Sequence, residues 1–183
     1  VTLKVASSSG LPVSVSVVSG PATLTGNALK ATGTGEVVLQ TLQSGTDDFA
    51  PVNAQRSIMV SPARQTLTWP VLADQKFGNP PVGVAVTAQS GLPVALTVAS
   101  GKATVNGTNV TLSGAGEVVL RAEQSGNANY EAISEVRSFK VAKAEQTLTV
   151  PTIANRAFNP QPFTPSAVVS SGLPVKYTVL SGP

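Results

Sequence analysis

A pentapeptide, Ser-Gly-Leu-Pro-Val, occurs three times in this chain, beginning at Ser9, Ser90 and Ser171. Each copy starts 81 residues after the previous one. The spacing extends beyond the pentapeptide, because residues 1–64 match residues 82–145 without a gap at 26 of 64 positions. A solenoid unit has a period of roughly 20 to 50 residues, so this longer period predicts whole small domains repeated in line.

The period divides the chain into three parts, since 81 residues are enough for a small domain with its own core. We expect residues 1–64 to be a repeat that lacks its first strand, and residues 65–145 to be a complete repeat. Residues 146–183 would hold the first three strands of a further repeat. We therefore interpret the chain as an excerpt of a longer polypeptide. The missing strands then belong to a continuous fibre or come from a neighbouring chain by strand complementation.

Hydrophobic alternation predicts strands throughout the complete period. Branched apolar residues take every second place in residues 94–98, and the same pattern assigns Val118, Leu120 and Ala122 to the core. Only 4% of residues are aromatic against 42% apolar, so this core is mainly aliphatic. The expected strands are residues 65–69, 82–88, 94–99, 103–105, 109–112, 117–124 and 135–141. Seven short strands separated by Gly-containing turns predict an all-β fold of antiparallel two-sheet sandwiches.

The composition excludes several classes of function. The chain has no cysteine and no histidine, which removes disulfides, thiol chemistry and the usual proton shuttle of enzymes. The net charge is only +3 and the basic residues are scattered, so we expect no nucleic-acid partner. No apolar run approaches the roughly 20 residues that cross a bilayer, so we expect no membrane insertion of this segment.

Metal and catalytic sites are also not expected. The one acidic pair, Asp47-Asp48, is replaced by Ala128-Asn129 in the next copy. A calcium cage usually needs several carboxylates close together, so the pair is interpreted as solvated side chains of a turn. We predict that the segment is not an enzyme and that it binds no cofactor and no metal.

Four motifs together carry a resemblance to a known family. They are Ser-Gly-Leu-Pro-Val, Val-Val-Ser-Gly-Pro-Ala from Val17, Ser-Gly-Asn-Ala-Asn-Tyr from Ser125 and Arg-Ser-Phe-Lys-Val from Arg137. With them the whole chain resembles the immunoglobulin-like tandem repeats of large bacterial cell-surface or secreted proteins. The resemblance implies tandem immunoglobulin-like β-sandwiches of about seven antiparallel strands and an extracellular or cell-surface location. Antibody-type domains pair cysteines, which this chain lacks, so recognition through hypervariable loops is not implied.

This resemblance implies a structural segment that forms a rod, stalk or filament. Its partners would be neighbouring repeats of the same polypeptide, or other copies of itself in a filament or by strand complementation. The linkers at residues 61–64 and 142–145 are short, which limits the angles between neighbours and favours an extended rod. The alternative is an adhesin module whose loops bind a glycan, matrix or a neighbouring cell.

One loop and one ring are the candidate site residues. Asn127, Asn129 and Tyr130 form the most distinctive loop, and Phe49 takes the place of the ring in the preceding copy. Amides beside a ring are suited to binding a sugar. In the structural alternative, the asparagines hold turns and the ring plugs the end of the sandwich. The recurrence of an aromatic here favours the plug. Trp69 is the only tryptophan, and we expect it at an inter-domain contact.

Overall fold

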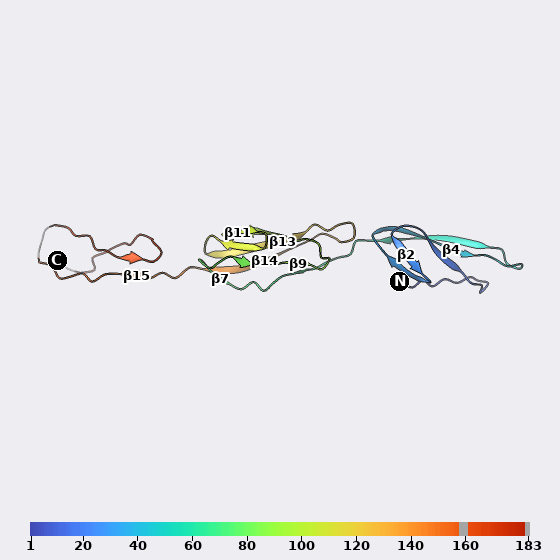
Figure 1. The fold of residues 1–183 in the computed structure, drawn as a ribbon, viewed down its shortest axis with the longest axis horizontal. Coiled ribbons are helices and arrows are strands. Elements are labelled where there is room, and N and C mark those ends of the chain that lie inside the picture. Colours follow the sequence, from blue (N-terminus) through green and yellow to red (C-terminus); the bar gives the residue numbers. More distant parts are fainter. Residues whose placement is uncertain (158–160, 182–183) are drawn as a thin grey trace.

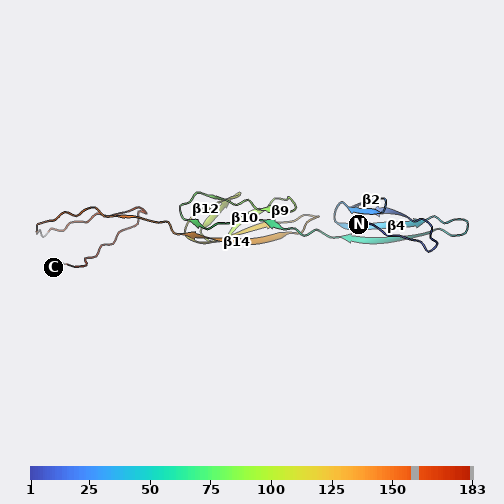
Figure 2. The same ribbon diagram turned by 90° about the horizontal axis from the view of Figure 1, so that it is seen from below.

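The computed structural model describes residues 1–157 and 161–181. These residues form strands in several sheets and contain no helix, which confirms the predicted all-β class. Accordingly, no described helix is long and apolar enough to cross a bilayer. Figures 1 and 2 show residues 1–64, residues 65–145 and the described part of residues 146–183 following one another along the longest axis. We call them the N-terminal, central and C-terminal segments.

The central segment is built from two main sheets and one additional strand pair. Its strands are β6 (Leu67–Thr68), β7 (Gln75–Lys76), β8 (Val82–Gly83), β9 (Thr87–Ala88), β10 (Ala95–Ser100), β11 (Ala103–Asn106), β12 (Asn109–Leu112), β13 (Gly116–Gln124) and β14 (Ile133–Ala142). One sheet has the order β10-β13-β14-β7, the other has the order β11-β12-β8, and β6 pairs with β9. This arrangement is compatible with a β-sandwich.

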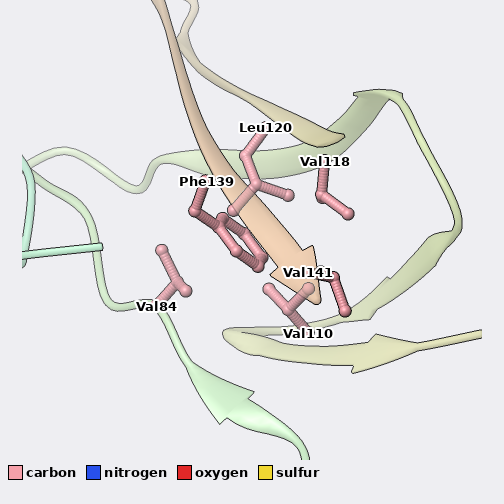
Figure 3. Close-up of a cluster of buried hydrophobic side chains, with 6 residues drawn as sticks. All are labelled: Val84, Val110, Val118, Leu120, Phe139 and Val141. Carbon is pink, nitrogen blue, oxygen red and sulfur yellow. The ribbon is translucent and has the colours of Figure 1, made fainter. Parts of the chain in front are cut away.

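Side chains from both sheets form the core of the central segment, as Figure 3 shows. The buried cluster consists of Val84, Val110, Val118, Leu120, Phe139 and Val141. Ala122 is also fully buried, so the predicted inward face of β13 is confirmed. The intervening residues of this strand carry the charges of Glu117, Arg121 and Glu123, which keeps that face in water.

The N-terminal segment repeats part of this arrangement. Its strands are β1 (Ser14–Ser19), β2 (Ala22–Thr25), β3 (Ala28–Ala31), β4 (Gly35–Gln43) and β5 (Val52–Val60). They form a sheet of order β1-β4-β5 and a β2-β3 pair. Strands β1 to β5 each start 81 residues before β10 to β14. The register repeats too, since Val17 pairs with Leu39 as Val98 pairs with Leu120, and a bulge follows in both.

A glycine after each bulge explains the repeated Ser-Gly dipeptide. Gly20 and Gly101 have φ angles of 101° and 104°. A Cβ atom on either would overlap the backbone of the neighbouring strand at Glu36 or Glu117. Only glycine fits this left-handed, crowded position.

Two expectations for the central segment are wrong in detail. The strand expected over residues 82–88 is interrupted, because β8 pairs with β12 while β9 pairs with β6. Between them the chain passes from the β11-β12-β8 sheet to the β6-β9 pair, with Val84 in the core. No strand was expected between residues 69 and 82, but this stretch contains β7, which runs parallel to the end of β14. Asp74 fixes this strand by accepting the Lys140 N–H at 2.8 Å.

The described part of the C-terminal segment has only two short strands, β15 (Leu148–Thr149) and β16 (Val168–Val169), which pair as β6 and β9 do. Residues 175–179 alternate like residues 94–98 but form no strand. In the central segment the counterpart strand β10 is held by β13. Residues 146–183 contain no counterpart of β13, and an unpaired strand is not stable in water.

Candidate functional site: the joint between the N-terminal and central segments

The candidate loop is closed by its first asparagine. Asn127 Oδ1 accepts the N–H groups of Asn129 and Tyr130 at 2.8 and 3.0 Å, and the Asn127 N–H donates to the Tyr130 carbonyl at 2.9 Å. Gly126 begins the loop with a φ of 72°, and a Cβ there would lie 2.5 Å from the same carbonyl oxygen. The Gly-Asn-x-Asn-Tyr sequence therefore sets a single tight backbone path.

A cluster of amide side chains attaches this loop to the rest of the central segment. The Gln65 amide nitrogen donates to Gln124 Oε1, and to the Glu131 carbonyl at 2.6 Å. Gln124 Oε1 also accepts the Gly126 N–H at 2.8 Å. Ser90 completes the cluster by donating to Gln65 Oε1 at 2.5 Å. Gln65 and Gln124 are buried, so these bonds satisfy polar groups that would otherwise be costly to bury.

This amide cluster explains why three separate motifs recur together. Ser90 opens Ser-Gly-Leu-Pro-Val, Gln65 opens Gln-Thr-Leu-Thr, and Gln124 precedes the loop motif. Ser171 and Gln146 make the same contact in the C-terminal segment, at 2.5 Å. Our sequence reasoning missed these residues, although their recurrence at the 81-residue spacing was the signal that could have found them.

The loop also binds the linker that precedes the central segment. Ala63, in this linker, donates its N–H to the Asn129 carbonyl at 2.8 Å. Its carbonyl accepts the Glu131 N–H at 2.9 Å, which makes a parallel bridge to Tyr130. Both backbone polar groups of Ala63 are thus used, and the linker is held against the loop.

A second contact reaches the body of the N-terminal segment. The Thr34 N–H donates to Asn129 Oδ1 at 3.1 Å, and Thr34 Oγ1 donates to the Ala128 carbonyl at 2.6 Å. An exposed ion pair joins Arg64 to Glu131 at 3.6 Å. Two separate sets of bonds therefore join the two segments.

The surface at this joint is a shallow groove lined by uncharged residues, both polar and apolar. Thr32 and Thr34 lie on one side of it, and Asn129 and Tyr130 lie on the other. Hydroxyl and amide groups accept and donate hydrogen bonds but move no proton near neutral pH. Among the described residues, no group of three His, Cys, Asp or Glu side chains gathers to hold a metal.

The structure brings together three of the five candidate residues. Asn127, Asn129 and Tyr130 lie in one loop at the joint. Phe49 lies in the matching loop of the N-terminal segment, where the Thr46 N–H donates to its carbonyl at 2.9 Å and its ring is exposed. The structural plug, which the sequence favoured, and the sugar site both stay predictions.

Trp69 makes contacts within the central segment. Its ring packs against both hydrophobic clusters of the central segment, and Nε1 donates to Glu135 Oε2 at 3.2 Å. These contacts stay inside one segment, so they give Trp69 a place in the core of the central segment rather than at the joint described above.

An exposed ion pair lies at the end of the central segment. Lys76 Nζ lies 2.7 Å from Glu145 Oε1, and both groups face water. The hydrogen bond from Lys76, followed by its positive charge, lowers the pKa of Glu145 from its ordinary value of 4.5. Nearby lie Phe77, Ala115 and Leu173.

Comparison with protein-family models and with curated proteins gives no match to this chain.

Proposed function

We propose that the chain is a run of tandem immunoglobulin-like β-sandwiches with an 81-residue period, and that it forms part of a structural rod, stalk or filament. Support comes from the strand boundaries and registers of β1 to β5 and β10 to β14, which recur at this spacing. The bacterial origin and the extracellular or cell-surface location rest on the motif resemblance alone.

The joint is the observation that carries this proposal. A rod needs neighbouring domains that keep their mutual orientation, and a linker without contacts would act as a hinge. Ala63 is paired on both of its backbone groups, and Thr34 holds the same loop from the body of the N-terminal segment. Any bend at this joint must lengthen one of the two sets of bonds. The role is therefore mechanical rather than catalytic, and the first partners are neighbouring repeats of the same polypeptide.

The same geometry favours the rod over the adhesin. In the adhesin alternative, Asn127 and Asn129 would present their amides to a glycan. Their oxygens instead accept backbone N–H groups, from Asn129 and Tyr130 and from Thr34 respectively. The loop at the joint is thus engaged in holding two segments together.

Small-angle scattering of the 183-residue chain tests the proposal. A strand rises about 3.3 Å per residue, so a domain with its loops should add roughly 35 to 45 Å to the length. We expect a rod-like curve with a cross-section of one domain and a length that grows by this step for each period. A compact particle would contradict the rod, and glycan binding that is lost in Asn129→Ala would favour the adhesin.

A further inference from the structure

Strand β14 of the central segment has an open edge. One side of β14 pairs with β13 along the strand. On the other side, β7 pairs only with Val141 and Ala142, and the bridge from Ala63 reaches only Tyr130. Among the described strands, none pairs with this side of β14 between those two contacts. Residues 65–76 are present to cover it, but β6 within them pairs with β9 instead. The open edge therefore belongs to a complete period.

Three residues of this edge direct their backbone groups away from β13. The Lys140 N–H and the Ala142 carbonyl both bond to the chain around β7, at 2.8 and 2.9 Å. Backbone groups of alternate residues point to the same side of a strand, so those of Ser134, Val136 and Ser138 also point away from β13. A strand laid along this edge would meet an N–H and a C=O group from each of the three.

β14 is a more regular edge than β10, the strand at the opposite end of the same sheet. The pairing of β10 with β13 shifts between Val98 and Ser100, whereas β14 keeps a continuous register with β13. A bulge turns an edge away from pairing, and a regular strand offers a template for it. Access is also present, since a groove of about 550 Å³ lies between residues 67–72 and Arg137 with Ser138.

The charges on this edge are complementary to those of a second, identical edge. Glu135 and Arg137 lie on either side of Val136, which is 55% exposed. Trp69 Nε1 donates to Glu135 Oε2 at 3.2 Å, and Arg137 lies 3.6 Å from the same oxygen. If two copies of β14 pair antiparallel about Val136, each Glu135 lies opposite Arg137 of the other copy. Opposite charges directly across a sheet stabilise the pairing.

We propose that two copies of this chain pair edge to edge through β14 of their central segments, antiparallel and centred on Val136. Ser134 of each copy then lies opposite Ser138 of the other, so all the outward backbone groups find partners. The charges fix the register, because a shift by two residues would place Glu135 opposite Glu135 or Arg137 opposite Arg137. Such like-charge pairs are destabilising.

The pairing is specific to the central segment of this chain. Its counterpart β5 in the N-terminal segment has Ala54 where β14 has Glu135, so Arg56 would lack an opposite charge. An isologous contact closes on itself, which limits the assembly to a dimer. Figure 2 shows β14 running along the longest axis, so the two molecules would lie side by side and point in opposite directions. The inference goes beyond the proposed rod, since it requires only the central segment.

Sedimentation velocity of the 183-residue chain over a range of concentrations tests the pairing. We expect the unchanged chain to form dimers and no larger species. Glu135→Arg and Arg137→Glu each bring like charges together, so each variant alone should raise the dissociation constant of the dimer at least about tenfold. A mixture of the two variants restores an opposite charge at every pair, so it should dimerise like the unchanged chain. Mixing would not rescue an effect on folding alone.

Two controls accompany these variants. Lys30→Glu, in the N-terminal segment, makes the same change in charge as Arg137→Glu and should leave the dissociation constant unchanged. Trp69 fluorescence reports whether the central segment of each variant stays folded.

A disulfide tests the register, since the chain has no native cysteine. The two Val136 Cα atoms of the proposed dimer are about 5.5 Å apart, a separation that a disulfide spans. Val136→Cys should therefore form a covalent dimer under mild oxidation. Thr97→Cys, exposed on β10, is the control and should stay monomeric.

A monomeric unchanged chain, failure of the mixed variants to dimerise, or equal cross-linking of Thr97→Cys would overturn the proposal. Scattering from Glu135→Arg, which we expect to be monomeric, still measures the length of the rod. The rod and the pairing can therefore fail or hold independently.

Discussion

At the scale of single residues, the oxygen of one amide links two segments. Asn129 Oδ1 accepts the Thr34 N–H, and it is in position because Asn127 holds the backbone of the loop. The loop in turn depends on a glycine at its start and on the buried Gln124 beneath it. A local sequence motif thus determines a contact between parts of the chain that are 95 residues apart.

Replacement of Gly126 by alanine should destabilise the central segment more than the same replacement of Gly107. In Gly126→Ala, the new Cβ would lie 2.5 Å from the Tyr130 carbonyl oxygen and 2.7 Å from the Ala132 nitrogen, both backbone atoms. Gly107 is the control, since its φ of 61° is similar but a Cβ there would meet nothing within 4 Å. We expect Gly107→Ala to cost about 1–2 kcal/mol from the left-handed backbone alone, and Gly126→Ala to cost more than twice as much.

Urea unfolding followed by Trp69 fluorescence measures both variants, because both glycines lie in the central segment. Equal losses of stability would show that the loop yields to the extra methyl group and that its path is not fixed by crowding.

Glu145 should titrate below its ordinary pKa of 4.5 because Lys76 donates a hydrogen bond to it and lies beside it with a positive charge. Since the pKa is lower in the folded state, the ion pair stabilises the folded state at pH values above the ordinary pKa. This contribution is lost as the pH falls through the lowered value. Lys76→Ala should return the pKa towards 4.5, and high salt should do so in part because both groups are exposed.

Carbon-detected NMR of the Glu145 carboxyl group measures this shift. Lys30→Ala, in the N-terminal segment, is the control and should leave the titration unchanged. A Glu145 pKa that does not respond to Lys76→Ala would show that the two side chains are not paired in solution.

At the scale of strands, the alternation of apolar residues along a single strand predicted which of its side chains face the core. Val118, Leu120 and Ala122 share a face of β13, and a period of two residues is enough to place them in the core. Residues 82–88 are apolar and alternate as well, but their partners change from β12 to β6 part of the way along. Pairing depends on distant residues, so the local pattern could not show the change.

The candidate site was predictable to a similar extent. Asn127 is a typical turn residue, and its loop was recognised from its composition. The engagement of Asn129 was not predictable, because it depends on Thr34 in another segment. Trp69 was expected at a joint from the pattern of its strand, and its ring packs against both clusters of the central segment. The residues that surround a ring come from distant parts of the chain, so the pattern of one strand does not specify them.

Leu120 and Leu39 offer a test of whether the segments fold on separate cores. They are counterparts on β13 and β4, and both are buried. Leu120→Ala should lower the free energy of unfolding of the central segment by about 2–5 kcal/mol through lost packing and a residual cavity. Leu39→Ala should leave the transition reported by Trp69 within about 0.5 kcal/mol of the unchanged chain, because distant sites act independently.

Denaturant unfolding with tryptophan fluorescence separates the two effects, since Trp69 reports only on the central segment. A comparable shift in Leu39→Ala would mean that the two segments unfold as one unit across the joint.

At the scale of the whole molecule, the stiffness of a rod depends on how its joints differ. The first joint has the paired backbone of Ala63 and the two hydrogen bonds of Thr34. At the position that matches Thr34, the central segment has Ala115, which offers no hydroxyl group. Stiffness would therefore vary along the array with the identity of this single residue.

Thr34→Ala combined with Asn129→Ala should loosen the first joint without unfolding either segment, since alanine already occupies the position that matches Thr34. The pair of changes removes both side-chain hydrogen bonds between the segments and leaves the Ala63 pairing. An exposed hydrogen bond at the low end of its range contributes about 0.5 kcal/mol. The loss of two such bonds should therefore raise the population of bent conformers roughly fivefold. The distribution of distances across the joint should broaden accordingly.

Pulsed electron spin resonance measures this distribution, and the chain has no native cysteine to interfere with labelling. Spin labels on Thr23→Cys and Thr104→Cys occupy matching exposed positions on β2 and β11, so their separation reports the angle between the two segments. Thr46→Ala, in the loop that matches the joint loop, is the control and should leave the distribution narrow. An unchanged width in the double variant would show that the Ala63 pairing and the exposed Arg64–Glu131 ion pair are enough to hold the joint. The short linker would then be sufficient for a rod, and the identity of the residue at position 34 would have no mechanical consequence.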